Sequence, residues 1–148
     1  MVDLVEYNSR LKDEVFRFTA ECFAELGKKF EPDGRHEFYK SIDEHFDGFW
    51  CLVDDGRVIG TVAVGRIDET TSELKALYVD NSYRGQGLGF KLLDHAVSFA
   101  RVSGYKRVVL DSMSKYESAA KLYRRYGFND IDRYNDNAYA DVFMELVF

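Results

Sequence analysis

Residues 73–101 read ELKALYVDNSYRGQGLGFKLLDHAVSFAR, and the order of features in this stretch decides how the chain folds. An apolar, strand-like run (Leu74–Val79) leads through a polar turn into the glycine-rich segment Arg84–Gly89. A long amphipathic helix follows directly, with one apolar face made of Leu88, Leu92, Leu93, Ala96, Val97 and Ala100. The first N–H groups of a helix have no partner inside it, and glycines let a ligand approach the backbone closely. The order therefore predicts an anion-binding loop.

This loop differs from the two common nucleotide-binding loops. It lacks the G-x-x-x-x-G-K-[ST] spacing that places a lysine and a hydroxyl for a γ-phosphate and Mg²⁺. Its Gly85-x-Gly87-x-Gly89 spacing is also not the G-x-G-x-x-G of dinucleotide sites. Taken alone, a glycine-rich loop is weak evidence for a ligand site, and an ordinary strand-to-helix connection is the alternative.

Two segments together resemble the signatures of the GCN5-related N-acetyltransferase (GNAT) family. RGQGLG at 84–89, after a strand ending LYV at 77–79, is similar to the acyl-CoA-binding motif [Q/R]-x-x-G-x-[G/A]. AAKLYRRYGF at 119–128 is similar to the second signature of the family. The resemblance extends from about residue 49 to the end, with both motifs in the family's order, and is weakest over the first 45 residues.

The composition is that of an ordinary soluble domain. The chain has 148 residues, of which 46% are hydrophobic and 31% are charged, and we expect one domain over residues 1–148. The formal net charge of −6 argues against a nucleic-acid partner, which would require a clustered basic face. No run approaches the length of a transmembrane helix, and the first residues lack the pattern of a signal peptide. We therefore expect a cytoplasmic protein without a membrane partner.

The cysteines and histidines indicate neither a disulfide framework nor a metal site. Cys22 and Cys51 are expected as buried or half-buried thiols. The three histidines match no zinc-binding spacing. We assign one of them, His95, to the solvated face of the long helix.

Periodicity and turn signals predict the order β-α-α-β-β-β-α-β-α-β-β. The expected strands are 3–7, 49–53, 58–64, 73–79, 106–111, 130–134 and 139–148, and the expected helices are 10–26 after a Ser9 cap, 35–45, 88–104 and 118–126. Asp54-Asp55-Gly56-Arg57 is a hairpin signal. An antiparallel meander followed by a parallel crossover gives a mixed sheet. This is an α/β (α+β) chain whose order matches the single-domain GNAT fold, a mixed central sheet flanked by helices.

The resemblance implies that acetyl-CoA, or a close relative, is the acyl donor. The loop N–H groups would take its pyrophosphate, and the main chain of the 77–79 strand would pair with its pantetheine arm in a slot between two splayed parallel strands. The residues implied in donor binding are Leu77, Tyr78, Val79, Arg84, Gly85, Gln86, Gly87, Leu88, Gly89, Tyr116 and Ala119. Tyr116 departs from the asparagine that the family often has there, so Tyr116, Ser114 or Ser118 would supply that contact.

The same resemblance implies two catalytic residues. An amine of pKa about 10.4 must lose a proton before it attacks, and the departing thiolate must gain one. Tyr123 is implied as the acid, although its spacing alone indicates packing between helix and sheet. Glu73 is implied as the base, with ordered water and backbone carbonyls, or a surface role beside Lys75, as alternatives. Strand alternation places Glu73, Lys75, Leu77 and Val79 on one face, and the resemblance suggests the Val79 N–H as the oxyanion donor.

The predicted function is N-acetyl transfer from acetyl-CoA to a primary amine of a small molecule or protein, directly in a ternary complex. An acyl-enzyme on Cys51 is disfavoured because no base lies near it in sequence. A non-catalytic acyl-CoA sensor is the alternative, and transfer to oxygen or sulfur stays open. The acceptor is left open between polyamine, amino acid, aminoglycoside, protein N-terminus and lysine. Residues 23–50 and the last hairpin are expected to contribute to its site, and the apolar last strand is compatible with a homodimer or a monomer.

Overall fold

The computed structural model describes all 148 residues, and its elements follow the predicted order. The strands are β1 (Val2–Glu6), β2 (Gly48–Asp54), β3 (Arg57–Arg66), β4 (Thr71–Val79), β5 (Arg107–Ser112), β6 (Asn129–Asp130) and β7 (Val142–Val147). The α-helices are α1 (Lys12–Glu25), α2 (Ile42–His45), α3 (Leu88–Val102) and α4 (Glu117–Tyr126). Short 3₁₀ turns lie at Ser9–Leu11, Glu37–Ser41 and Asn81–Tyr83. None of these helices combines the length and the apolar character that a membrane span requires.

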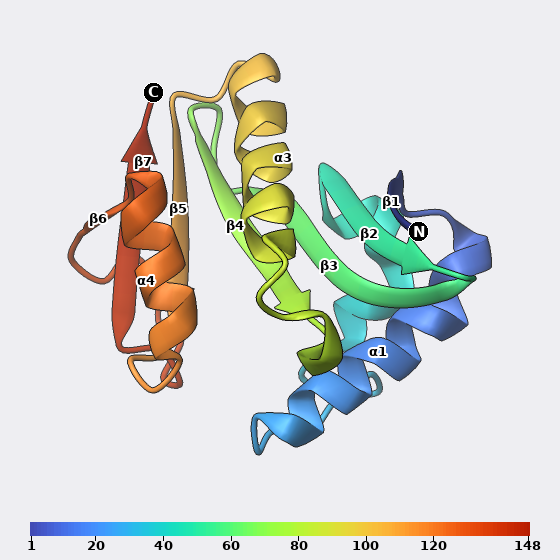
Figure 1. Cartoon of the computed structure of the whole chain (residues 1–148). Coiled ribbons are helices and arrows are strands. Elements are labelled where there is room, and N and C mark those ends of the chain that lie inside the picture. The colour runs from blue at the N-terminus through green and yellow to red at the C-terminus, as the bar shows by residue number, and fades with distance from the viewer.

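The seven strands form one mixed sheet in the order β1-β2-β3-β4-β5-β7-β6. Every neighbouring pair is antiparallel except β4 and β5, which are parallel and joined through α3. Helices α3 and α4 lie on one face of the sheet, and α1 packs on the other (Figure 1). The mixed sheet with flanking helices and a parallel crossover is therefore the predicted fold class.

Two hydrophobic cores share this sheet, one on each face. Consecutive residues of a strand point to opposite faces, so Leu52 packs under α3 while Cys51 packs towards α1. Val62 and Ala63 divide in the same way on β3. Burial on both faces explains why β2 and β3 are continuous apolar runs. Both cysteines are buried as free thiols, as expected.

The parallel pair β4–β5 separates after three residues. Thr71, Ser72 and Glu73 pair with β5, and the rest of β4 has no partner on that side. The register of β4 on β3 shifts near Ala76, which has a left-handed φ of 55°. Thr61 Oγ1 donates a hydrogen bond of 2.7 Å to the carbonyl of Ala76. This β-bulge turns the second half of β4 away from β5 and leaves one edge of β4 free.

The bulge also shows that one expectation from strand alternation is wrong. Leu74 packs in the same core as Leu77 and Val79, although strict alternation would separate Leu74 from the other two. The extra residue at Ala76 shifts the phase of alternation by one position. Glu73 therefore lies on the opposite face of β4 from Leu77 and Val79.

The expected helix at 35–45 is shorter than predicted. A 3₁₀ turn occupies Glu37–Ser41, and only Ile42–His45 is α-helical. The first long helix begins at Lys12, not Arg10, because the Asn8 side chain accepts a hydrogen bond from Arg10 N and starts a 3₁₀ turn there. Ser9 is therefore not the cap. His95 is half-buried against Trp50, with ring centroids 4.8 Å apart, rather than on a fully solvated face.

The last hairpin is also shorter than predicted. The strand expected at 130–134 is reduced to β6, and β7 starts at Val142 rather than Tyr139. The guanidinium of Arg133 donates hydrogen bonds to the carbonyls of Asn137 and Ala140, at 2.8 and 2.9 Å. These bonds hold residues 131–141 as a looped segment, because carbonyls taken by Arg133 are unavailable to a strand ladder.

Candidate active site

Two cavities meet where β4 leaves β5. The first, called here the large cavity, has a volume of about 1280 Å³ and extends towards residues 23–46 and 135–140. The second, the loop cavity, measures about 650 Å³ and lies against the glycine-rich segment. Both are lined by Leu77, Tyr78, Lys115, Tyr116, Ala119 and Tyr123. A ligand in the loop cavity can therefore reach the large cavity between the separated strands.

The glycine-rich segment presents a row of unpaired amides to the loop cavity. Gly85 and Gly87 have φ values of 80° and 75°, a backbone conformation that favours glycine. The N–H groups of residues 85–90 donate to no protein acceptor, and α3 begins at Leu88. Those amides and the N-terminal end of the helix dipole form a cradle for an anion. Arg84 also lines the cavity, whereas Gln86 does not.

The free edge of β4 adds further donors. Asp80 N donates to the carbonyl of Ile59 at 2.8 Å, so that position bonds towards β3. Backbone groups of an antiparallel pair alternate in direction from one residue to the next. The N–H groups of Val79 and Leu77 therefore point to the opposite edge, which faces the loop cavity. This edge is able to pair with an extended ligand as an added strand.

Tyr123 is buried in the core and also lines both cavities. Its side chain is 7% exposed and packs near Phe128, with ring centroids 5.9 Å apart. Its hydroxyl makes no hydrogen bond within the protein. Burial raises the pKa of Tyr123 well above its ordinary value of 10.0, so the phenol stays protonated at neutral pH. A protonated, unengaged hydroxyl at the junction of the cavities is placed to donate a proton.

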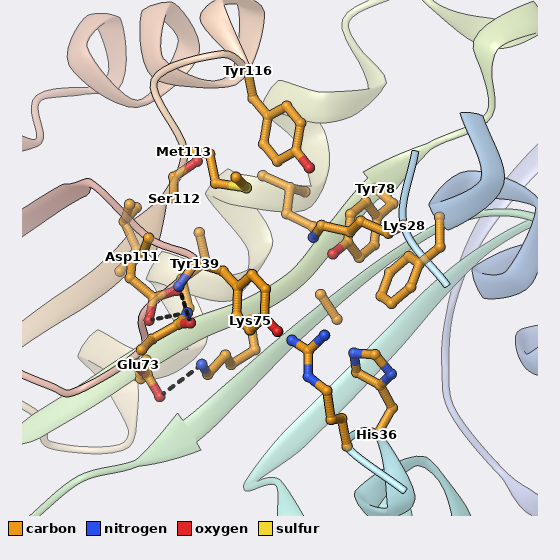
Figure 2. A pocket seen from close by; sticks show the side chains of 18 of the residues that line it. Lys28, His36, Glu73, Lys75, Tyr78, Asp111, Ser112, Met113, Tyr116 and Tyr139 are labelled. Carbon is orange, nitrogen blue, oxygen red and sulfur yellow. Dashed lines mark hydrogen bonds and ion pairs between the residues drawn. The ribbon is translucent and has the colours of Figure 1, made fainter. Parts of the chain in front are cut away.

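Glu73 is the last residue of β4 that pairs with β5, and it lines the large cavity. Its carboxylate accepts a hydrogen bond of 2.5 Å from Tyr134 and lies 3.5 Å from the Lys75 ammonium. Figure 2 shows Glu73 on the same side of this cavity as Asp111. Burial, and then the hydrogen bond to Glu73, raise the pKa of Tyr134, so Tyr134 remains a donor.

Asp111 is a functional candidate that sequence reasoning missed. It follows the buried core of β5, and its Oδ2 accepts hydrogen bonds from Asn135 Nδ2 at 2.7 Å and Asn137 Nδ2 at 3.3 Å. The sequence indicated Asn135 and Asn137 only as a hairpin turn. A carboxylate at the carboxyl end of a buried strand was the available signal, because ligands of α/β sheets bind at the carboxyl ends of the strands.

A group of basic side chains on the other side of the large cavity was missed as well. Lys28, Arg35 and His36 come from the segment after α1. Glu31 N donates to His36 Nδ1 at 3.0 Å, so the neutral ring carries its proton on Nε2. Burial, followed by the Arg35 charge, lowers the pKa of His36 and favours that neutral form. No group of three His, Cys, Asp or Glu side chains is placed to hold a metal ion.

Tyr116 is the residue that departs from the family pattern, and the structure shows which side chains near it line the cavities. Tyr116 lines both cavities, and its buried hydroxyl has no hydrogen-bond partner. Ser118 lines the loop cavity alone. Ser114 lines neither, because its hydroxyl and N–H are both bonded to Asp141. Tyr116 and Ser118 are therefore the side chains available for a ligand at this position.

Solved structures of acetyltransferases share this fold. An acetyltransferase of the GNAT family from Staphylococcus aureus Mu50 superposes with a TM-score of 0.90 at 24% identity, covering 98% of both chains. A GNAT family acetyltransferase from Brucella melitensis in complex with acetyl-CoA has a TM-score of 0.74 at 20% identity, covering 100% of this chain and 88% of that one.

Sequence comparison points in the same direction. N-acetylaspartate synthetase from Danio rerio is 36% identical over 89 residues, which are 60% of this chain and 32% of that protein. The matched region thus spans about a third of the length of that relative. The model of the Acetyltransferase (GNAT) family matches residues 12–128, which include the glycine-rich loop, the separated strands and Tyr123. The chain belongs to the acetyltransferase (GNAT) family.

Proposed function

We propose that this protein transfers an acetyl group from acetyl-CoA to a primary amine, directly and within one ternary complex, and that its 148 residues act as one domain. The observation that carries the proposal is the passage between β4 and β5, which joins an anion cradle to a second cavity with Tyr123 at the junction. The acetyl-CoA complex of the Brucella melitensis relative and the named product of the Danio rerio relative, an N-acetylated amine, support the donor and the acceptor class.

The residues of the loop cavity fit acetyl-CoA. The unpaired N–H groups of residues 85–90 suit a pyrophosphate, and Arg84 adds a formal positive charge. The free edge of β4 at Leu77 and Val79 suits the amides of a pantetheine arm. Tyr116, Ser118 and Ala119 close the cavity from the side of α4. Acetyl-CoA, when bound, supplies an activated thioester carbonyl.

In the proposed mechanism, Glu73 accepts the proton of the incoming ammonium, directly or through one water. The amine nitrogen then forms a bond to the acetyl carbon while the carbon–sulfur bond breaks. Tyr123 donates its phenolic proton to the departing sulfur, and the Val79 N–H faces the cavity where an oxyanion would need a donor. The nitrogen loses its second proton as it becomes an amide. That proton and the one held by Glu73 leave to solvent, from which Tyr123 regains one, so the protein ends unchanged and one proton is released per turnover.

Donor binding is tested with two glycines of matched backbone geometry at opposite ends of α3. Gly87→Glu places a carboxylate in the anion cradle and strains a residue of φ 75°. Gly104→Glu introduces the same side chain at a φ of 95°, beyond the far end of the helix. Calorimetric titration with acetyl-CoA should show affinity lowered about tenfold or more by Gly87→Glu, since like charges repel and the glycine conformation is lost. Gly104→Glu should leave the affinity within about twofold. Equal losses in both variants would count against the loop as donor site.

Catalysis is tested with two tyrosines of the same helix. Tyr123→Phe removes the proposed acid, so kcat should fall about a hundredfold while acetyl-CoA affinity is kept. Tyr126 lines neither cavity and bonds Asp94 at 2.7 Å, so Tyr126→Phe should leave kcat unchanged. CoA release with an amine panel is the measurement. A wild-type protein that binds acetyl-CoA but releases no CoA with any amine would instead support the sensor.

A further inference from the structure

We propose that the acceptor is an amine that also carries a carboxylate, as an amino acid does, and that Lys28, Arg35 and His36 bind this carboxylate. The inference rests on the proposed function and names the substrate class of the same site. It is carried by the distribution of charge across the large cavity, which separates acidic from basic side chains.

The large cavity is more basic than the protein around it. In the whole chain, 26 Asp and Glu outnumber 20 Lys and Arg. The lining of this cavity reverses that balance, with Lys28, Lys29, Arg35, Lys75 and Lys115 against Glu31, Glu73, Asp111 and Asp136. A basic cavity in an acidic protein attracts an anionic group and repels a polycation.

The carboxylates of Glu73 and Asp111 already have bonding partners within the protein. The cations across the large cavity have no partner of opposite charge. Glu73 is bonded by Tyr134 and paired with Lys75, and Asp111 accepts two amide hydrogen bonds. Neither Lys28 nor Arg35 has a carboxylate within 4.0 Å. Burial, and then the charges of Arg35 and Lys115, lower the pKa of Lys28. A bound carboxylate would relieve this repulsion, because it supplies the missing counter-charge.

Contacts with neighbouring groups also hold the side chains of Lys28, Arg35 and His36 in place. The Arg35 guanidinium stacks on the ring of Tyr139 at 4.1 Å from its centroid, and the Lys28 ammonium lies 5.4 Å from the ring centre of Tyr116. The bond from Glu31 N fixes the His36 ring with its Nε2–H available to a ligand. Two cations and one neutral donor of this kind suit the several lone pairs of a carboxylate.

The two sides of the cavity are complementary to a zwitterion. Figure 2 shows Glu73 and Asp111 on one side and Lys28 and His36 across the cavity. An amino-acid-like acceptor can place its ammonium towards Glu73 and its carboxylate towards Lys28 and His36. A polyamine or a lysine-rich peptide would instead bring a second cation against the basic side, which is unfavourable.

The phosphates of acetyl-CoA are not the expected partners of these cations. Lys28, Arg35 and His36 line the large cavity only, whereas the unpaired amides face the loop cavity. Of the basic residues in the large cavity, Lys115 alone lines both. Loss of the Arg35 charge should therefore change acceptor use and leave acetyl-CoA affinity intact.

The experiment compares matched acceptors with the purified protein and saturating acetyl-CoA. L-Aspartate, L-leucine and L-phenylalanine are each assayed beside the α-carboxamide of the same amino acid, with spermidine as a polycation, by CoA release. We expect kcat/KM for at least one free acid to exceed that of its carboxamide about tenfold or more, because a charge-assisted contact is lost in the amide. Arg35→Gln should remove most of this preference and leave the carboxamide rate within about twofold, and Arg35→Lys should restore part of it.

Lys121→Gln is the matched control, since this exposed residue of α4 lines neither cavity and its loss changes the net charge equally. It should keep the full preference, and circular dichroism checks the fold of every variant. Carboxamides that react as well as free acids, an equal loss for both in Arg35→Gln, or no reaction of any free acid would each overturn the inference. If spermidine reacts and none of the amino acids does, the inference is overturned while the proposed function stands. Failure of the wild type to bind acetyl-CoA would remove the proposed function itself.

Discussion

At the scale of single residues, the Glu73 carboxylate is held between the Tyr134 hydroxyl at 2.5 Å and the Lys75 ammonium at 3.5 Å. Tyr134→Phe removes the shorter contact without changing the ring, so the proposed base loses its orienting donor. A hydrogen bond to a charged group contributes about 1.5–3 kcal/mol, and we expect kcat/KM to fall about tenfold or more. Steady-state kinetics with a reacting amine provide the measurement.

The control for Tyr134 is a second tyrosine bonded to a carboxylate. The hydroxyl of Tyr105 donates to Asp47, and neither residue lines the large cavity or the loop cavity. Tyr105→Phe should lower the melting temperature and leave kcat/KM unchanged. If both variants lose activity to the same extent, the effect is general destabilisation and Tyr134 does not position the base.

A functional residue could be predicted from the sequence when the residues it acts with are close to it along the chain. It could not be predicted when its contacts come from distant segments. The glycine loop could be predicted because Gly85, Gly87 and the start of α3 are neighbours in sequence. The Tyr134–Glu73 contact spans 61 residues. The bond of Asp111 to Asn135 spans 24. Such contacts exist only after the sheet has formed, so no local pattern could show them.

At the scale of elements, the bulge in β4 determines the width of the slot between β4 and β5. The hydroxyl of Thr61 is buried and bonds the Ala76 carbonyl at 2.7 Å. Thr61→Val keeps the shape of the side chain and removes this buried hydrogen bond, so stability should fall by about 1–3 kcal/mol. Because the bulge orients the free edge of β4, acetyl-CoA affinity should fall as well, about fivefold, by calorimetry.

Ser72→Ala is the matched variant for this bulge. The buried hydroxyl of Ser72 bonds the carbonyl of Arg107 at 3.0 Å, where β4 and β5 are still paired. Its loss should cost similar stability in a denaturant titration and leave acetyl-CoA affinity unchanged. Equal affinity losses in both variants would show that the bulge has no particular role in the slot.

Elements whose signals are local followed the prediction, and those fixed by distant contacts did not. The Asp54–Arg57 hairpin has φ values of 52° and 76° at Asp55 and Gly56, as an Asp-Gly turn between strands predicts. The face of the sheet that each side chain of β4 takes after the bulge could not be predicted, because the bulge depends on a hydroxyl from β3. The extent of the last hairpin depends likewise on three-dimensional contacts made by the Arg133 side chain.

At the scale of the whole molecule, the core on the α1 side contains both thiols. Cys22 is 6% exposed and Cys51 is 0% exposed. Burial raises the pKa of each thiol from 9.0 to about 12. The unfolded chain therefore loses these protons at a lower pH than the folded chain does. The stability linked to them is complete below about pH 9 and is lost as the pH rises towards 12.

The size of this effect follows from linkage. Above about pH 9, each thiol that is ionised only in the unfolded state costs about 1.4 kcal/mol per pH unit. The two should therefore remove about 3 kcal/mol by pH 10, with little of this loss below pH 9. Denaturant titrations at about pH 8 and pH 10, under reducing conditions, measure the loss. The Cys22→Ala/Cys51→Ala variant should be less stable at pH 8, because it leaves cavities in the core, but should lose clearly less stability on going to pH 10. If the two proteins lose stability equally over this range, the alkaline sensitivity arises elsewhere, and the buried tyrosines, which ionise in the unfolded chain near pH 10, become its source.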